Sequence, residues 1–132
     1  MVPAPMIISS LNGDVGGQTI RGASLVVGDW TTDGVANEVA PLHVHHADDE
    51  AWHVVSGALR FRFDDQELTA RVGTTVLVPA GVPHTFGNAG LGPSRFLIIL
   101  PARLDRLISR LHQSGPAEHP AIYRDFESEL LE

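Results

Sequence analysis

The sequence predicts an all-β domain, an antiparallel sandwich or barrel, with one or two short helices at its C-terminal end. Short segments rich in β-branched or alternating apolar residues recur over Ser24–Leu100, and turn residues separate them. After Pro101 the apolar residues recur at helical spacing instead. We therefore expect one domain over residues 1–132, with a barrel core over about residues 20–100 and a helical extension over about residues 101–132.

The strand from Leu59 to Phe63 has the clearest pattern, because apolar and charged residues alternate along its whole length. Successive side chains of a strand point to opposite faces. Its three apolar residues should therefore face the interior, while Arg60 and Arg62 should face solvent. Asp64-Asp65 then turns the chain into the next strand.

The remaining strands follow from β-branched runs and the turns between them. Residues 50–55 and 58–63 flank Ser56-Gly57, a dipeptide that predicts a β-hairpin between the two runs. Asp33-Gly34 marks a loop, and the prolines of Pro79–Pro83 mark a turn that no helix could cross. Further strands are expected over residues 24–30, 67–71, 74–78, 85–86 and 95–100.

The C-terminal helices are predicted from two apolar stripes. Leu104, Leu107, Ile108 and Leu111 recur at helical spacing in a helix that should begin near residue 101 and end before Ser114-Gly115-Pro116. A second short helix should carry the apolar residues Ile122, Phe126 and Leu130. We interpret both stripes as ordinary core or dimer packing and assign them no catalytic role.

Composition excludes several classes of chemistry. The chain has no cysteine, so disulfides, thiolate metal sites, cysteine nucleophiles and iron–sulfur clusters are ruled out. Its formal net charge of −7 repels phosphate backbones, which argues against nucleic-acid binding. Residues 1–14 lack the basic and apolar regions of a secretory signal, and no apolar stretch is long enough to span a bilayer. We expect a cytoplasmic protein that does not bind membranes.

Five of the seven histidines lie between positions 43 and 84. His43 and His45 form an H-x-H pair, and on a strand both imidazoles would lie on the same face. Glu50 follows after a gap that allows a bend, and His84 follows the proline-rich turn. Imidazole and carboxylate groups are common ligands of divalent transition metals. The pattern indicates a metal site of three nitrogens and one oxygen with coordination positions left open.

Two motifs around these residues resemble those of the cupin family. The first family motif is G-x5-H-x-H-x3,4-E-x6-G, and the chain has His43-x-His45, four residues, Glu50, six residues and Gly57. The second is G-x5-P-x-G-x2-H-x3-N, and Gly73–Asn88 matches all five of its fixed positions.

The resemblance covers about residues 41–101 and departs from the family at one position. Asn37 stands where the first motif opens with glycine. Asparagine tolerates left-handed backbone geometry, so the turn could be kept. Asp49 would fit the shorter permitted gap after the H-x-H pair, but its distance to Gly57 would then differ from the motif, which favours Glu50.

The resemblance implies a jelly-roll barrel that binds one divalent transition metal ion: iron, manganese, nickel, zinc or copper. The implied ligands are His43, His45, Glu50 and His84. We interpret His46 and His53 as exposed or packed side chains without a metal, and we expect His112 and His119, which lie outside the barrel segment, to be solvated.

The cupin family spans dioxygenases, isomerases, decarboxylases, epimerases and non-catalytic binding modules, so the fold alone does not set the reaction. By this resemblance we expect a metal-dependent, dioxygenase-like enzyme that acts on a small organic molecule, with isomerase or decarboxylase activity as further candidates. Glu50 is the expected catalytic residue, as a ligand and, when displaced, as a base. The alternatives are a non-catalytic module for a small ligand or metal, and a dimer whose metal only stabilises the fold.

Aromatic residues could line a substrate pocket or fill the core, and core packing is the commoner outcome in small barrels. These residues are Trp52, Phe61, Phe63, Phe86 and Phe96. Arg95 could pair with a substrate carboxylate, although an exposed edge position fits better. Related cupins usually pair, and exposed sheet edges and apolar faces favour a partner. We therefore expect a homodimer formed through the first strands and the C-terminal helices.

Overall fold

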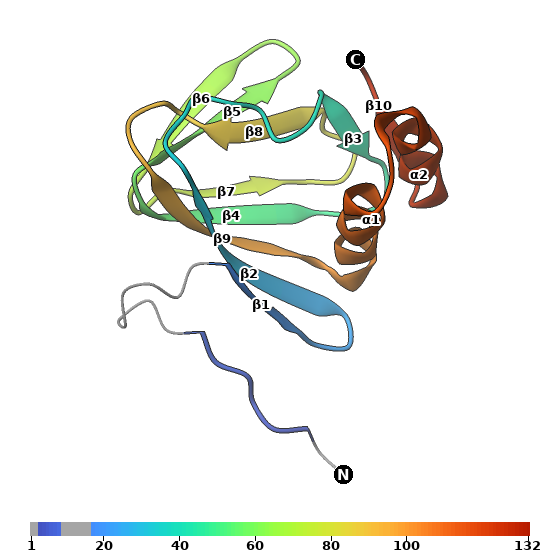
Figure 1. The fold of residues 1–132 in the computed structure, drawn as a ribbon, viewed down its shortest axis with the longest axis horizontal. Helices are drawn as coiled ribbons and strands as arrows, with labels where there is room; N and C mark the ends of the chain where they lie inside the picture. Colours follow the sequence, from blue (N-terminus) through green and yellow to red (C-terminus); the bar gives the residue numbers. More distant parts are fainter. Residues whose placement is uncertain (1–2, 9–16) are drawn as a thin grey trace.

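The computed structural model describes residues 3–8 and 17–132, and it shows two antiparallel sheets packed face to face as a jelly roll (Figure 1). Part of the N-terminal stretch in which we expect no secretory signal, residues 1–2 and 9–16, lies outside the described residues. The strands are β1 (Gln18–Arg21), β2 (Leu25–Thr32), β3 (His43–His45), β4 (Glu50–Ser56), β5 (Ala58–Phe63), β6 (Glu67–Arg71), β7 (Thr75–Val78), β8 (His84–Asn88), β9 (Ser94–Pro101) and β10 (Ser128–Leu130).

Each sheet contains five strands. The first sheet has the order β1-β2-β9-β4-β7, and the second has the order β10-β3-β8-β5-β6. Buried and partly buried residues alternate along the whole of β9, as expected for a strand with one face on a core. The inner faces of the two sheets therefore enclose one apolar interior.

Aromatic side chains fill the centre of this interior. The Trp52 ring lies 5.1 Å from that of Phe61 and 5.2 Å from that of Phe86, and Phe86 lies 5.6 Å from Phe96. All four are buried, and the half-buried Phe63 stacks on Phe61. These residues pack on one another, which favours core packing over a role as separate pocket walls. Burial of each such side chain stabilises the fold by about 1.5–3 kcal/mol.

The alternation in β5 is confirmed, with one exception. Leu59 and Phe61 are fully buried and Arg60 is exposed. Arg62 is not simply solvated: its guanidinium is half-buried and pairs with Glu38 at 2.7 Å and with Glu132 at 2.8 Å. These ion pairs hold the C-terminal residue against the barrel.

The predicted hairpin at Ser56-Gly57 is wrong, because β4 and β5 belong to different sheets. The pairing register of β4 shifts between Val54 and Ser56, and Gly57 has a φ of +70°. A Cβ atom at this glycine would collide with the backbone carbonyl of Pro93. The dipeptide therefore forms a corner that carries the chain from one sheet to the other, and the hairpin lies instead between β5 and β6.

The exposed edge position expected for Arg95 is also wrong. Arg95 lies on β9, which pairs with β2 on one side and β4 on the other. Its guanidinium donates to the fully buried Asp29 carboxylate at 2.8 and 2.6 Å. Because a buried carboxylate needs a charged partner, this pair has a structural explanation and is not a substrate clamp.

The C-terminal extension forms α1 (Ala102–His112), a 3₁₀ turn (Pro116–Glu118), α2 (His119–Asp125) and then β10. Leu104 and Leu107 of α1 are buried, as the apolar stripe predicts. The prediction that the second helix includes Leu130 is wrong, because α2 ends at Asp125 and Leu130 lies in β10. Glu127 has a φ of +50° and separates α2 from this strand. Among the described residues, no helix has both the length and the apolar character needed to cross a membrane.

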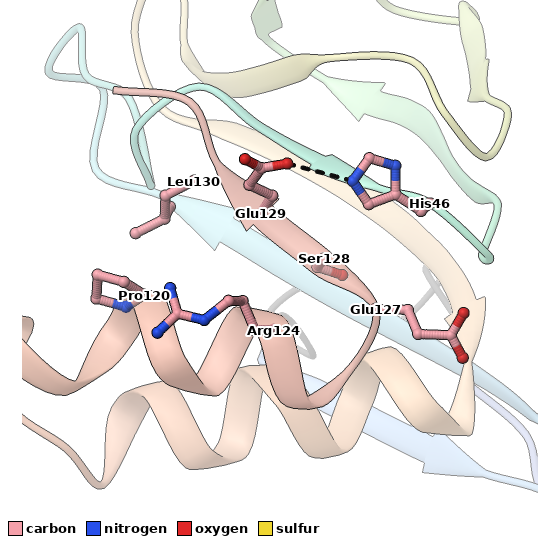
Figure 2. Close-up of a pocket in the computed structure, with 7 residues that line it drawn as sticks. All are labelled: His46, Pro120, Arg124, Glu127, Ser128, Glu129 and Leu130. Carbon is pink, nitrogen blue, oxygen red and sulfur yellow. Dashed lines mark ion pairs between the residues drawn. The ribbon is translucent and has the colours of Figure 1, made fainter.

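The outer side of α2 and β10 carries a surface pocket whose lining includes His46, Arg124 and Glu129 (Figure 2). Nε2 of His46 lies 3.5 Å from the Glu129 carboxylate, and both side chains are more than half exposed. His46 therefore points away from the interior, as predicted.

Candidate metal centre

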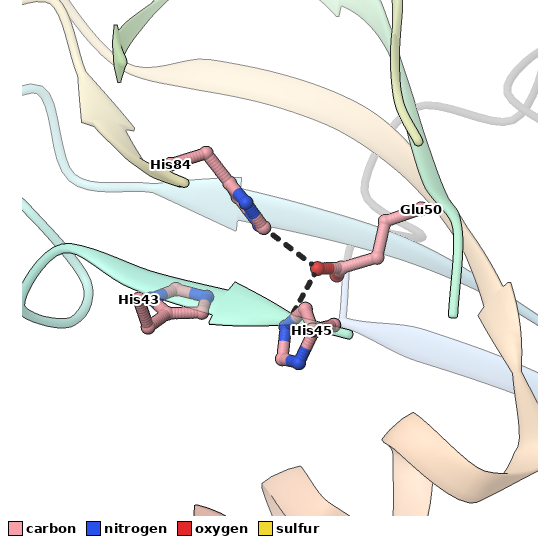
Figure 3. A group of neighbouring side chains, drawn as sticks. All are labelled: His43, His45, Glu50 and His84. Carbon is pink, nitrogen blue, oxygen red and sulfur yellow. Dashed lines mark hydrogen bonds and ion pairs between the residues drawn. The ribbon is translucent and has the colours of Figure 1, made fainter. Parts of the chain in front are cut away.

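Four side chains from both sheets meet at the end of the jelly roll beside the C-terminal helices (Figure 3). His43 and His45 lie on β3, Glu50 begins β4 and His84 begins β8. Their ligand atoms all lie within 4.8 Å of one another, and all four residues are buried. The structure thus brings together the four residues that the sequence predicts as metal ligands.

The register of the second sheet explains how the histidines meet. His43 and His45 share a face of β3, and His84 is the direct partner of His43 in the β3–β8 ladder. The turn over Pro79–Pro83 delivers His84 to this position. Within it, Gly81 has a φ of +89° and donates its N–H to the carbonyl oxygen of His45 at 2.8 Å. The turn is therefore fastened to the strand that carries the other two histidines.

Glu50 reaches the cluster from the first sheet. Its Oε1 lies 2.9 Å from Nε2 of His45 and 3.0 Å from Nε2 of His84. The ring of His43 lies 4.6 Å from that of His84 and 4.9 Å from that of His45, measured between centroids. One carboxylate oxygen is thus shared by two imidazoles, with the third beside them.

Two of the imidazoles have their Nδ1 atoms fixed by backbone carbonyls. Nδ1 of His43 lies 2.8 Å from the oxygen of Pro41, and Nδ1 of His84 lies 2.9 Å from the oxygen of Val82. A carbonyl only accepts hydrogen bonds, so both Nδ1 atoms must carry the proton. The Nε2 atom of each neutral ring then presents a lone pair.

The third imidazole reaches the same tautomer through a hydroxyl group. Nδ1 of His45 lies 2.7 Å from Oγ of Ser128, and this hydroxyl donates to the carbonyl oxygen of Phe126 at 3.1 Å. When the Ser128 hydroxyl donates to that carbonyl, Oγ accepts from Nδ1–H of His45. With this arrangement all three histidines have Nε2 as the free ring nitrogen.

This arrangement requires positive charge between the His84 ring and the carboxylate. Nε2 of His84 lies 3.0 Å from Oε1 of Glu50, yet the neutral His84 ring has no hydrogen left to donate there, because its proton is on Nδ1. Either this ring takes up an extra proton or a cation lies between it and the carboxylate. A metal ion satisfies both groups at once.

The charges of two residues suit metal coordination at neutral pH. Burial lowers the pKa of His43 to about 4, and His84 and His45 act in the same direction. Burial raises the pKa of Glu50, but its contacts with His45 and His84 outweigh burial and bring it to about 2. His43 is therefore neutral and Glu50 ionised, the states in which both groups bind a metal.

The residues present fit a divalent transition metal ion. Metal–nitrogen and metal–oxygen bonds are about 2.1 Å long, so donors on opposite sides of one ion stand about 4.2 Å apart. The observed limit of 4.8 Å exceeds this by about half an ångström, so only small side-chain movements separate the four donors from one ion. Three nitrogens and one oxygen are also the donor set that such ions take in open sites.

The residues predicted to stay outside the metal site do so. Oδ1 of Asp49 accepts the N–H of Ala80 at 2.8 Å, so it caps the turn beside the cluster. His53 lies on the partly exposed outer face of β4, with Nδ1 2.8 Å from Oγ1 of Thr75. The carboxylate of Glu50 therefore faces the histidines, whereas that of Asp49 binds the backbone of the neighbouring turn.

The two C-terminal histidines differ from each other. His112 is exposed, as predicted. The prediction that His119 is solvated is wrong: the side chain is half-buried, and its Nε2 lies 3.1 Å from the carbonyl oxygen of Leu111. Its role is to join the start of α2 to the end of α1.

Tyr123 of α2 belongs to the site although the sequence did not indicate it. The side chain is 3% exposed, and its ring is nearly parallel to that of His45 at 6.4 Å and lies 5.4 Å from that of His43. Burial, helped by the charge of Glu50, raises the pKa of Tyr123 to about 12, so the phenol stays neutral. The residue sits within an apolar stripe, and nothing in the order of the residues signals its contact with β3.

Two further features border the site. Glu50 contributes to the lining of a surface pocket that also includes Asp49 and Leu77 and lies on the outer face of the first sheet, whereas its carboxylate points inward to the imidazoles. On the inner side, the Trp52 ring lies 5.8 Å from that of His84, and its buried Nε1–H has no hydrogen-bond partner among the described residues. A buried donor without a partner is costly, so this N–H is available to an acceptor on a bound molecule or water.

The family model described as "Cupin domain" matches residues 35–100, a stretch that contains the whole cluster. The chain belongs to the cupin family. The match begins before the first motif and ends within β9, so the C-terminal extension of this cupin lies outside it. No curated protein matches the chain.

Solved structures show the same fold. A cupin-2 domain containing protein from Shewanella frigidimarina aligns with a TM-score of 0.53 and 24% identity, over 62% of this chain and 74% of that one. A cupin protein from Bacteroides fragilis aligns with a TM-score of 0.61 and 15% identity, over 74% and 82%. A sugar phosphate isomerase of the cupin superfamily from Silicibacter pomeroyi shares 26% identity with a TM-score of 0.54, over 60% of this chain and 51% of that one.

The departure from the first cupin motif has a structural explanation that differs from the expected one. Asn37 does not adopt a positive φ. Its side-chain oxygen instead accepts the N–H of Asn88, the last residue of the second motif, at 2.8 Å. Asn88 in turn braces the following loop by donating to the carbonyl of Gly92 at 3.0 Å, as predicted. The two motifs are thus joined through their asparagines.

Proposed function

We propose that this cupin binds one divalent transition metal ion on His43, His45, Glu50 and His84 and acts as a dioxygenase-like enzyme on a small organic molecule. The observation that carries the proposal is the buried group of three imidazoles around one carboxylate, with Nδ1 of two rings held by backbone carbonyls and Nδ1 of the third beside Ser128. A bound ion would supply Lewis acidity and one-electron chemistry toward a chelating enolate or phenolate.

The surrounding side chains would orient such a substrate and exclude water. Tyr123 covers the rings of His43 and His45 from the C-terminal side. Trp52 borders His84 from the barrel interior and offers its unpartnered N–H to a substrate oxygen. A largely apolar lining strengthens electrostatic interactions and protects reactive species from water.

Glu50 is proposed as a ligand first and a base second. While it faces the two imidazoles its pKa of about 2 makes it a weak base at neutral pH. Burial acts in the opposite direction, so its pKa would rise once the carboxylate turned away from His45 and His84. A substrate that displaces Glu50 would therefore meet a stronger base.

The proposed substrate is a neutral molecule that can bind the ion through two oxygen atoms. Flavonols, catechols and β-diketones are neutral, electron-rich and able to chelate once deprotonated, so they form the proposed substrate class.

The second candidate is an isomerase that moves a proton with Glu50 and needs no oxygen. It is favoured by the 26% identity to a structure described as a sugar phosphate isomerase, although this chain spans about half of that protein's length. A non-catalytic binding module is the remaining alternative.

Oxygen uptake by protein reconstituted with iron(II) or manganese(II) tests the proposal against a panel of flavonols, catechols and β-diketones. We expect uptake with one of these classes, its loss in Glu50→Ala and its retention in His53→Ala, which changes a side chain on the outer face of the same strand. Absence of uptake across the panel with the metal confirmed in place would favour the binding module. Conversion of a sugar phosphate without oxygen would favour the isomerase.

A further inference from the structure

The C-terminal segment of residues 119–132 lies outside the part of the chain that the family model matches, yet it contacts the cluster directly. In the β10–β3 ladder Ser128 stands opposite His45 and Leu130 stands opposite His43. The segment is also held from both sides, because Glu132 pairs with Arg62 and Glu127 pairs with Arg103. Its position beside the histidines is therefore fixed by the fold.

A chain of hydrogen bonds leads outward from His45. Nδ1–H donates to Ser128 Oγ at 2.7 Å, and the Ser128 hydroxyl donates to the carbonyl oxygen of Phe126 at 3.1 Å. The same carbonyl accepts from Nη2 of Arg103 at 3.0 Å, while Nε of Arg103 donates to Asp48 at 3.0 Å. With the Ser128 hydrogen directed to the Phe126 carbonyl, the Ser128 oxygen presents a lone pair to Nδ1–H of His45.

His43 and His84 obtain the same tautomer from backbone carbonyls, which no side-chain change can remove. For His45 the acceptor is a side chain, 3% exposed, from a different part of the sequence. Without the Ser128 hydroxyl, the buried Nδ1–H of His45 would have no partner. The ring could then carry its proton on Nε2, and a protonated Nε2 cannot bind a metal.

We propose that Ser128 is a positioning residue of the metal centre, which fixes His45 in the tautomer and orientation that offer Nε2 to the ion. This inference rests on the metal centre proposed above. Outer hydrogen-bonding partners of this kind typically change metal affinity about 10- to 100-fold. The C-terminal extension would then be a constituent of the site in addition to a packing element.

The variants that test this proposal are Ser128→Ala, which removes the acceptor, and Ser128→Thr, which keeps a hydroxyl group. Ser94→Ala is the matched control, because Ser94 is also a buried, hydrogen-bonded strand serine but lies in the Thr32–Asn88 network. Zinc affinity of each variant is measured by competition with a chelator. The histidine tautomers of the metal-free protein are read from ¹⁵N chemical shifts of the ring nitrogens.

We expect Ser128→Ala to weaken zinc binding about tenfold or more and to change the His45 ring signals, while Ser128→Thr recovers most of the affinity. Ser94→Ala should lower the melting temperature without either effect. Unchanged affinity and ring signals in Ser128→Ala would overturn the proposal, and so would equal weakening by Ser94→Ala. If the wild type binds no zinc, the proposed metal centre fails, and the ring signals of the metal-free protein still decide whether Ser128 fixes the tautomer.

Discussion

His43 and His84 stand directly opposite each other in the β3–β8 ladder, with their ring centroids 4.6 Å apart. One residue comes from each cupin motif. Their strand pairing brings the two motifs together through the backbone, and this does not depend on a bound ion. The other two members, His45 and Glu50, then close the group from β3 and from the first sheet.

Replacement of His84 should weaken metal binding far more than replacement of His53. His84 is 2% exposed and its Nε2 faces Glu50, whereas His53 lies on the opposite face of β4 beside Thr75. We expect His84→Ala to lose more affinity than the roughly 10- to 100-fold typical of an outer-shell change. His53→Ala is the control and should keep its metal. Equal metal content in the two variants, measured after the same reconstitution, would refute the assignment.

Acid should destabilise the metal-free protein. The pKa of His43 is lowered from 6.5 to about 4. Between pH 6.5 and about 4, His43 is therefore protonated in the unfolded chain but remains neutral in the folded chain. The pKa of Glu50, lowered from 4.5 to about 2, has the same effect at lower pH. The free energy of unfolding should therefore fall as pH drops from about 6.5 toward 2. Denaturant unfolding at several pH values measures this slope, and a rise in stability over the range would contradict it.

Metal retention should fall over the same acid range. Protons compete with the ion for the imidazole nitrogens, since a protonated imidazole cannot coordinate. Metal content after equilibrium dialysis at stepped pH tests this expectation. A content that stayed flat from neutral pH to about pH 4 would argue against histidine ligands.

The ring of Tyr123 should matter more for stability than its hydroxyl group. The ring is buried against His43 and His45, while the hydroxyl makes no hydrogen bond to the part of the chain that the structure describes. Tyr123→Ala should cost about 3–5 kcal/mol, and Tyr123→Phe less than about 1 kcal/mol. Thermal and denaturant unfolding of the two variants make the comparison. Similar losses would show that the hydroxyl has a partner.

We expect this cupin to be a homodimer that covers the outer face of the first sheet. Leu25 is 55% exposed and Leu77 is 63% exposed on this face, with the half-buried Val27 and Ile99 between them. Apolar faces of this kind favour a partner. Light scattering at tens of micromolar should give twice the mass of one chain, and Leu77→Asp should shift it toward one chain. A monomeric wild type would exclude the dimer.

The cluster of three histidines and Glu50 was predictable because its signal is local. The spacing of His43, His45 and Glu50, and the short turn before His84, restrict where each side chain can point, and strand periodicity does the rest. The β5–β6 hairpin was predictable for the same reason. Alternation and turn residues specify geometry over a few residues.

The features that escaped prediction depend on contacts between distant segments. Whether Gly57 makes a hairpin or a corner depends on its contact with Pro93, and whether Leu130 extends a helix or begins a new pairing depends on β3. Tyr123 and Ser128 become part of the site only because β10 pairs with the strand that carries the histidines. No local pattern encodes such a pairing.

Metal stoichiometry tests the proposed metal centre most directly, because the proposal rests on the four-residue cluster. Protein purified without added nickel, reconstituted with iron(II), manganese(II) or zinc(II) and freed of excess ion, would be analysed for metal beside a His43→Ala/His84→Ala variant. We expect about one ion per chain in the wild type, because the chain has one such cluster, and almost none in the variant. Absence of a stoichiometric metal from the wild type under all three conditions, or equal content in the variant, would contradict it.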